Sequence, residues 1–261
     1  MAAVGTEGEP AAGTEGAVAA VGTEGARAAA ADAVAGEAGA GGSPPDPAMY
    51  SAFMQYKEVF VTGGTGLLGQ YVCGSLIGHG FLPRLFVRPG SEGRIAPDVR
   101  QRCRVTPGEL TVRESVEMGA QGTSAIVHLA EVWKEQPRRG VTFEEANVHA
   151  TANVLHSASV WGIRRLIFVG VGGSRPGDPD PYLDARGRAE ALVRGSDRSW
   201  TVFRAAPWYD LRDGTPRVTT EYLKELAGAV VESVRRQDTV GRVYEDASTD
   251  RFPWRELSRG S

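Results

Sequence analysis

A glycine-rich stretch follows the first apolar segment of the chain. Residues 59–61 are β-branched and aromatic, which indicates a buried strand. The chain then reads TGGTGLLG, so that Gly63, Gly66 and Gly69 recur at intervals of three. Glycines at this spacing let the backbone pass close to a pyrophosphate, direct the first N–H groups of the next helix at it, and let that helix pack on the strand. The pattern predicts a dinucleotide-binding turn.

The segments on either side of this turn make the pattern specific. Glycine accounts for 34 of 261 residues, so chance matches are expected, and Gly64 alone gives a second, overlapping match. A strand before the turn and a helix after it are the context that a true nucleotide-binding turn requires. The residues expected at the nucleotide are Thr62, Gly63, Gly64, Thr65, Gly66, Leu67, Leu68 and Gly69.

Strand-like and helix-like segments alternate along the rest of the chain. Further strands are expected at 85–87, 103–106, 125–129, 166–169, 200–203 and 241–245. Helices are expected at 68–79, 148–162 and 183–193, and from Thr219 or Thr220 to 234. Strands joined by helical crossovers pair in parallel with right-handed connections. The sequence therefore predicts an α/β fold, a Rossmann-like doubly wound parallel sheet with a short C-terminal helical segment.

Composition narrows the class of protein. The formal net charge is -3 and no basic stripe appears, which argues against nucleic-acid binding. The sequence has no apolar run long enough to cross a bilayer, and its N-terminus lacks the features of a secretory signal. We expect a cytoplasmic protein that acts on a small molecule, with no membrane insertion.

Cysteine and histidine positions do not suggest a metal centre. Cys73 and Cys103 match no metal-binding spacing and no disulfide framework, which favours a reducing compartment. His128 ends a strand, and His149 and His156 lie on a helix without a nearby carboxylate set. Since metal sites need several converging donors, these histidines are interpreted as core or surface residues.

Residues 1–48 differ in composition from the rest. They are dominated by Ala, Gly, Glu and Thr with VGTEG repeated, and contain no aromatic residue. Ordering such a segment would cost backbone entropy without compensating burial, so disorder is predicted. The alternatives are a partner-binding tail and an upstream extension of the natural reading frame, since Met49 and Met54 each precede the first strand. The folded domain is expected to span 49–261.

The ordered series of motifs resembles the short-chain dehydrogenase/reductase superfamily, in its extended and atypical (NmrA-like) branches. The resemblance runs from about Lys57 almost to the end of the chain. It rests on TGGTGLLG from Thr62, VRPGSE from Val87, PGEL from Pro107, AIVHLAE from Ala125, NVHATANVL from Asn147, RRLIFVG from Arg164, YLDARGRAE from Tyr182 and TVFRAAP from Thr201. It implies that this chain binds NAD(P)(H). The glycines would lie at the pyrophosphate, Glu109 and Leu110 near the adenine, and residues 127–130, which include Leu129 and Ala130, beneath the cofactor.

The end of the second expected strand bears on the choice between NADP(H) and NAD(H). An acidic residue there binds the ribose 2′-hydroxyl, whereas an arginine pairs with a 2′-phosphate. The chain has Arg88 at this place, and no acidic residue follows it before Glu92. NADP(H) is therefore favoured and NAD(H) is the alternative. The alternative is that Arg88 has no functional role and is simply a solvated residue at the end of a strand.

The catalytic motif of the family is altered. The resemblance implies Tyr-x-x-x-Lys, in which lysine lowers the pKa of the tyrosine and holds the nicotinamide ribose. The nearest match is Tyr182 with Arg186, and arginine does not titrate. The serine that the family has at the end of the fifth strand is missing, and Ser174 lies in the loop beyond. Tyr182 is either a proton donor or a tyrosine packed at a helix start.

Two functions fit this altered motif. The first is NADP(H)-dependent hydride transfer to a small acceptor of the quinone, flavin or carbonyl type, for which positioning supplies most of the rate. The second is a catalytically silent NADP(H)-binding redox sensor or assembly subunit. The compressed run at 205–218 predicts a small or shallow pocket, or one that a second subunit completes in a homo-oligomer or larger assembly.

Four aromatic residues follow the fourth and sixth expected strands: Trp133, Phe143, Trp208 and Tyr209. In open α/β sheets, ligands bind at the carboxyl edge of the strands, where these loops lie. The aromatic residues are interpreted either as a pocket for a flat acceptor or as packing for the C-terminal segment.

Overall fold

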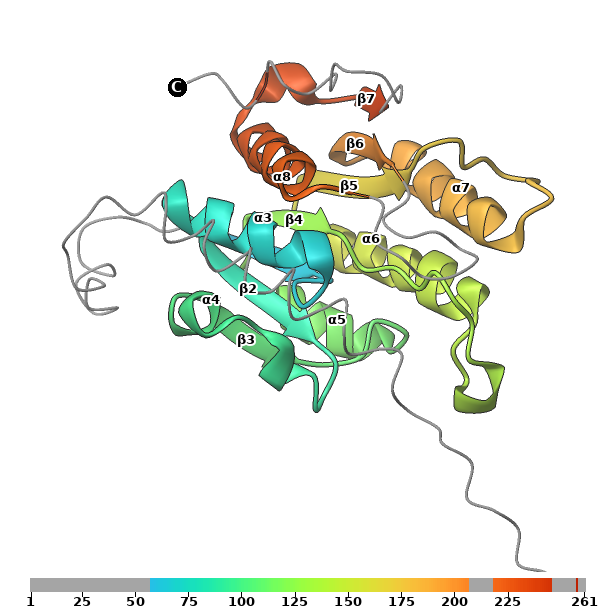
Figure 1. Cartoon of the computed structure of the whole chain (residues 1–261), viewed down its shortest axis with the longest axis horizontal. Coiled ribbons are helices and arrows are strands. Elements are labelled where there is room, and N and C mark those ends of the chain that lie inside the picture. The colour runs from blue at the N-terminus through green and yellow to red at the C-terminus, as the bar shows by residue number, and fades with distance from the viewer. Residues whose placement is uncertain (1–56, 207–217, 246–256, 258–261) are drawn as a thin grey trace, which may run out of the picture.

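The described residues form one seven-stranded sheet with helices on both faces (Figure 1). The structure is a computed structural model in which residues 57–206, 218–245 and 257 are described. All strand pairs are parallel, in the order β3-β2-β1-β4-β5-β6-β7. The strands are β1 (Glu58–Thr62), β2 (Leu82–Val87), β3 (Arg104–Pro107), β4 (Ala125–His128), β5 (Arg165–Val171), β6 (Ser199–Ala205) and β7 (Arg242–Glu245).

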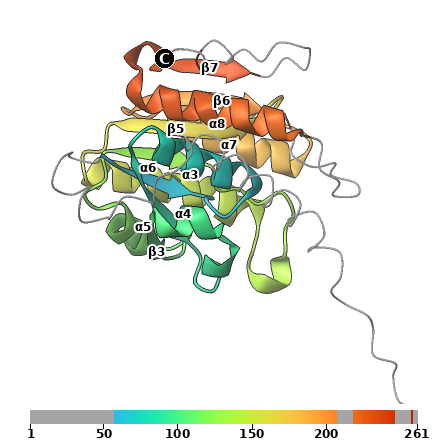
Figure 2. The same cartoon turned by 60° about the vertical axis from the view of Figure 1, so that its left-hand side comes forward.

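Helices connect successive strands and cover both faces of the sheet (Figure 2). The α-helices are α3 (Leu67–Gly78), α4 (Pro97–Gln101), α5 (Arg113–Ala120), α6 (Ala150–Val160), α7 (Pro181–Arg194) and α8 (Thr220–Arg235). Short 3₁₀ segments occur at η1 (Glu92–Arg94), η2 (Pro137–Arg139) and η4 (Gln237–Thr239), and a π-helical segment, η3 (Glu144–His149), leads into α6. Helices α3, α4 and α8 contribute to the core on one face, and α5, α6 and α7 to the core on the other.

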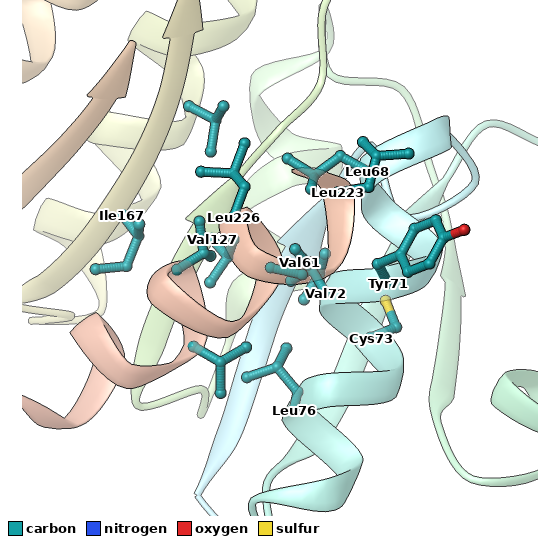
Figure 3. Close-up of a cluster of buried hydrophobic side chains, with 14 of the residues drawn as sticks. Val61, Leu68, Tyr71, Val72, Cys73, Leu76, Val127, Ile167, Leu223 and Leu226 are labelled. Carbon is teal, nitrogen blue, oxygen red and sulfur yellow. The ribbon is translucent and has the colours of Figure 1, made fainter. Parts of the chain in front are cut away.

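The alternation of side chains along the central strands builds a core on each face. Val59 and Val61 of β1 belong to the core under α3 and α8, while Phe60 between them belongs to the core under α5, α6 and α7. Because both faces are covered, the central strands are apolar throughout, as buried parallel strands usually are. Figure 3 shows the first of these cores, with Val61, Val127 and Ile167 of the sheet beneath Leu68, Val72, Leu76, Leu223 and Leu226 of the two helices.

The predicted α/β fold and parallel doubly wound sheet are confirmed, and the main difference lies between β3 and β4. Helix α5 was not expected there, because its apolar signal is weak: only Val116, Gly119 and Ala120 are buried. The helix before β5 also begins earlier than expected, with η3 in front of α6. The tail at 1–48 lies outside the described residues, so its predicted state and the domain boundary stay predictions.

The strand order reverses between β1 and β4, which lie side by side although two strands separate them in sequence. Thr62 and His128 are in register at the carboxyl ends of β1 and β4, and His128 is paired with Phe168 in the middle of β5, which extends three residues further. In doubly wound sheets, ligands bind in the crevice beyond this point of reversal. The site is therefore built from the loops that follow these three strands.

Candidate functional site

The turn after β1 is pressed against the loop after β4. Gly63 has φ of 74°, and a Cβ atom on it would lie 2.7 Å from the nitrogen of Ala130 and 2.8 Å from the carbonyl carbon of Leu129. Both the backbone conformation and the space therefore require glycine at this position. The structure thus brings together the predicted turn and the two residues expected beneath the cofactor.

The amino end of α3 has the features of a phosphate-binding helix terminus. Its N-cap is Gly66, and no side-chain cap bonds its first N–H groups in the described part of the chain. A Cβ atom on Gly69 would lie 2.2 Å from the oxygen of Gly63, so the third glycine allows the helix to pack against the turn. The helix macrodipole adds positive potential at this end. A pyrophosphate fits this cradle of glycines and free N–H groups.

A chain of hydrogen bonds joins the carboxyl ends of β1 and β4 to α6. Thr62 Oγ1 lies 2.6 Å from His128 Nδ1, and His128 Nε2 lies 2.9 Å from Thr151 Oγ1. Thr151 donates its own proton to the carbonyl of Asn147 at 2.7 Å, so Nε2 carries the hydrogen and Nδ1 accepts from Thr62. Ala130 N in turn donates to Thr62 Oγ1 at 3.3 Å. The network fixes the strand ends that support the nucleotide turn.

His128 is held in its neutral form inside this network. Burial lowers its pKa to about 3, and the positive charge of Arg186 acts in the same direction. A buried imidazole with both nitrogens in hydrogen bonds has no free lone pair for a ligand. Its position supports the interpretation of His128 as a core residue.

The exposed histidines do have carboxylate neighbours, contrary to expectation. His149 Nδ1 lies 3.1 Å from Glu145, and His156 Nε2 lies 2.9 Å from Glu117. The prediction failed for His156 because Glu117 comes from α5, the helix that the sequence did not reveal. The described residues contain no group of three or more His, Cys, Asp or Glu side chains arranged to hold a metal ion.

Tyr182 and Arg186 lie one turn apart on the buried side of α7. Asp180 caps this helix, because its side chain accepts hydrogen bonds from the N–H groups of Tyr182 and Leu183 at 2.8 and 3.2 Å. Tyr182 is 5% exposed, and its ring lies 5.6 Å from that of Phe143. Arg186 is 1% exposed. The two predicted catalytic residues are therefore adjacent and almost wholly buried.

Glu131, which sequence reasoning missed, connects these two residues. The Tyr182 hydroxyl donates to Glu131 Oε2 at 2.9 Å, and Arg186 Nε lies 3.4 Å from the same oxygen. Arg186 also donates through Nη2 to the carbonyl of Val169 at 2.5 Å, while its Nη1 is buried without a hydrogen-bond partner. The available signal was an acidic residue three positions after a buried strand, at the edge where ligands bind.

The electrostatics at Tyr182 are opposite to those of a Tyr-x-x-x-Lys pair. Burial raises the pKa of the Tyr182 hydroxyl well above its ordinary value, and the Glu131 carboxylate raises it further. Arg186 lowers this pKa, but by less than burial and Glu131 raise it. Tyr182 is therefore a protonated phenol whose hydrogen points at a carboxylate.

The loop that carries Glu131 is anchored by side chains of η3 and its own residues. The amide of Asn147 accepts from Val132 N at 2.8 Å and donates to Val132 O at 2.9 Å. Glu135 accepts from Phe143 N at 2.7 Å, which closes the loop. Of the predicted aromatic group, Phe143 packs on Tyr182, whereas 208 and 209 lie outside the described residues.

Arg88 at the end of β2 has an acidic neighbour that its sequence context did not show. Arg88 Nε lies 3.4 Å from Glu109 Oε2. The pair forms because Val87 and Pro107 are in register at the ends of β2 and β3, so the residues just beyond them are neighbours. Leu110 is anchored by Asn153, which donates to its carbonyl at 2.9 Å. The expected ribose and adenine residues therefore share one edge of the sheet.

Comparison with known proteins identifies the family. A family model described as NAD(P)H-binding matches residues 63–245, which is more than half of the chain. The chain belongs to the NAD(P)H-binding family. The solved structures that share its fold include short-chain dehydrogenase/reductase and epimerase-like proteins.

Two solved structures and one curated protein illustrate this likeness. A candidate NAD-dependent epimerase/dehydratase from Bacillus halodurans has a TM-score of 0.63 at 20% identity, over 77% of this chain and 98% of its own. A short-chain dehydrogenase/reductase from Agrobacterium tumefaciens with bound NAD has a TM-score of 0.56 at 18% identity, over 72% and 76%. At these identities the likeness concerns the fold.

The curated relative is 4-hydroxy-2-methyl-3-oxo-4-farnesyl-3,4-dihydroquinoline-1-oxide ketoreductase from Stigmatella aurantiaca. It is 30% identical over 112 residues, which are 43% of this chain and 33% of the relative. This chain therefore matches a third of that protein's length. Among the described residues, no helix combines the length and the apolar character that a membrane span requires.

Proposed function

We propose that the protein is an NADP(H)-dependent reductase that transfers hydride to a small acceptor of the carbonyl, quinone or flavin type. One observation carries the proposal: a single short loop joins the nucleotide turn to the phenol. Ala130 packs on Gly63, and the next residue, Glu131, binds the hydroxyl of Tyr182. A group able to exchange a proton thus lies beside the expected place of the nicotinamide.

Different residues of the chain would bind the cofactor and donate the proton in such a reaction. The bound cofactor supplies the hydride. Gly63, Gly66 and the amino end of α3 would hold its pyrophosphate, and Arg88 would pair with a 2′-phosphate. Tyr182 would face the acceptor oxygen that becomes negatively charged during hydride transfer. Burial of Tyr182 keeps water from this proton.

Both the curated relative and the site bear on the class of acceptor. The matched relative is named as a ketoreductase, which favours a carbonyl acceptor here. Quinones and flavins stay in the proposal because they accept hydride with little help from an acid. Both cysteines of the chain are free, so we place the activity in the cytoplasm. The proposed partner is a small molecule, with a second subunit as the element that would complete a shallow pocket.

A specific observation favours a second function, a silent NADP(H)-binding sensor or assembly subunit. The phenol hydrogen of Tyr182 is already bound by Glu131, and Arg186 donates to the backbone at Val169. In a Tyr-x-x-x-Lys pair, lysine lowers the pKa of the tyrosine, whereas the effect of Arg186 on the pKa of Tyr182 is outweighed by burial and Glu131. A protein that only reports or stabilises its cofactor has no need of a tyrosine with a lowered pKa.

The two functions are separated by cofactor titration followed by turnover. The full chain is titrated with NADPH and NADH by fluorescence, and NADPH oxidation is then followed by absorbance with ketones, aldehydes, quinones and flavins. Acceptor-dependent oxidation is expected. Tyr182→Phe should lower the rate with carbonyl acceptors by about 100-fold, the scale of general acid catalysis, and Tyr244→Phe on β7 is the matched control. Binding without turnover of any acceptor supports the silent function instead.

A further inference from the structure

One carboxylate oxygen occupies the place between the phenol and the guanidinium. Glu131 Oε2 accepts the Tyr182 hydroxyl at 2.9 Å and lies 3.4 Å from Arg186 Nε. The Glu131 side chain is 12% exposed and that of Arg186 1% exposed. In water-poor surroundings a carboxylate and a guanidinium at this distance act as a neutral pair. The positive charge that would otherwise favour a phenolate is therefore balanced.

The charges around the phenol come from two elements in the described part of the chain. Glu131 faces the phenol from the loop after β4, while Arg186 and the capping residue Asp180 face it from α7. Phe143 packs on the ring without adding charge. The two carboxylates, of Glu131 and Asp180, disfavour ionisation of the phenol, and the single guanidinium of Arg186 does not offset them. Tyr182 therefore has no stable way to lose its proton unless another group replaces it in the same step.

We propose that Glu131 is the proton partner of Tyr182 in the reduction of a carbonyl acceptor. The inference rests on the reductase function proposed above. The Glu131 carboxylate first takes up a proton from water. Hydride from NADPH forms a C–H bond at the carbonyl carbon, and the C=O electron pair moves to the oxygen. The acceptor oxygen then takes the proton of the Tyr182 hydroxyl, and the phenol oxygen takes the proton that Glu131 holds. Glu131 is left as a carboxylate beside Arg186 and regains a proton from water.

This assignment gives Arg186 a role different from that of lysine in the family. It contacts Glu131 rather than the phenol, and its stacking on Phe168, with 5.0 Å between guanidinium carbon and ring centre, fixes it in place. Arg186 stabilises the carboxylate that remains after proton transfer. Glu131 and Arg186 are thus positioning residues that act through Tyr182, which alone meets the acceptor.

A kinetic experiment tests the role of Glu131 with three variants of the full chain. Glu131→Gln keeps the shape of the side chain but cannot take up and release a proton, so kcat with a carbonyl acceptor should fall by about 100-fold at unchanged NADPH affinity. Glu131→Asp should restore part of the rate. Glu144→Gln, which removes a carboxylate paired with Arg188 on α7, is the control and should behave as wild type.

A spectroscopic experiment tests the proton coupling without any turnover. A fluorinated tyrosine, whose hydroxyl is more acidic than that of tyrosine, is placed at 182 and its ionisation is followed by ¹⁹F NMR. Its pKa should be lower in the Glu131→Gln background than with Glu131 present, because a negative neighbour is lost. An unchanged pKa overturns the proton partnership.

The possible failures are distinguishable. Wild-type rates in Glu131→Gln would overturn the partnership and leave the reductase function intact. Absence of turnover by the wild-type chain with every acceptor would overturn the reductase function, and the partnership with it.

Discussion

Arg88 and Glu109 lie against each other at the ends of β2 and β3, with Nε of the arginine 3.4 Å from Oε2 of the glutamate. Their side chains are 60% and 41% exposed, and an exposed pair of this kind adds little to stability. The pair instead affects how the 2′-position of the cofactor would be recognised. A 2′-phosphate would have to share Arg88 with Glu109, whereas a free 2′-hydroxyl could donate to Glu109. The pair therefore moderates the preference for NADP(H) that Arg88 alone would give.

Cofactor preference should change in opposite directions when the two partners are substituted. Arg88→Ala should weaken NADPH binding by about 10-fold, the scale of one charge-assisted hydrogen bond, and leave NADH binding nearly unchanged. Glu109→Gln should strengthen NADPH binding, since Arg88 loses its competing partner. Fluorescence titrations with both cofactors at low and high salt measure these effects, which salt should reduce. Equal effects on NADPH and NADH would show that Arg88 does not contact the 2′-position.

The glycine turn gives a second prediction. Gly63→Ala would place Cβ 2.7 Å from the nitrogen of Ala130 at a φ of 74°, so the turn and the loop after β4 would have to separate. We expect loss of NADPH binding and a fall in the free energy of unfolding of about 1–3 kcal/mol. Gly93→Ala is the control, because its added Cβ would meet nothing within 4 Å. Calorimetry and fluorescence titration give the two readouts, and normal binding by the Gly63 variant would contradict the assigned cradle.

The fold and the nucleotide turn were predictable because their signals are local. A strand such as β1 is apolar throughout since both of its faces are covered, and the glycines are dictated by contacts within one strand–turn–helix unit. A threonine cap of α8, at Thr219 or Thr220, was predictable for the same reason, and Thr219 is the one whose side chain accepts from Tyr222 N. Helix α5 was missed because few of its residues are buried.

The contacts that define the chemistry of the site were not predictable, because they join residues distant in sequence. Glu131 and Tyr182 are 51 positions apart in the sequence, and neither segment contains a signal that predicts contact with the other. Glu109 meets Arg88 only because β2 and β3 end in register. The sequence supplied the residue types, and the strand order determined which of them became neighbours.

Stability at acid pH should depend on His128. Its pKa is lowered to about 3 in the folded protein, from an ordinary value of 6.5. As pH falls below 6.5, the unfolded chain gains a proton that the folded chain does not, so stability is lost progressively down to about pH 3. The slope from this residue is at most about 1.4 kcal/mol per pH unit. Urea unfolding of wild type and His128→Asn should show stability curves that converge as pH falls from 7 to 4, and parallel curves would contradict the neutral buried state.

Asn147 should affect catalysis through the loop that carries Glu131. It is 1% exposed, and its amide bonds both backbone groups of Val132, the residue after Glu131. Asn147→Asp keeps the acceptor but sets a carboxylate against the Val132 carbonyl. We expect a stability loss of about 1–3 kcal/mol, together with a lower kcat at unchanged NADPH affinity, because Glu131 loses its position.

The matched control is Asn153→Asp on α6, which removes a similar bond, to the carbonyl of Leu110 beside the expected adenine. This variant should lose comparable stability, but its effect should appear in NADPH affinity rather than in kcat. Thermal unfolding, cofactor titration and turnover with one carbonyl acceptor separate the two variants. If both variants lower kcat equally, the effect comes from general destabilisation. In that case the loop after β4 does not hold the proton partner in place.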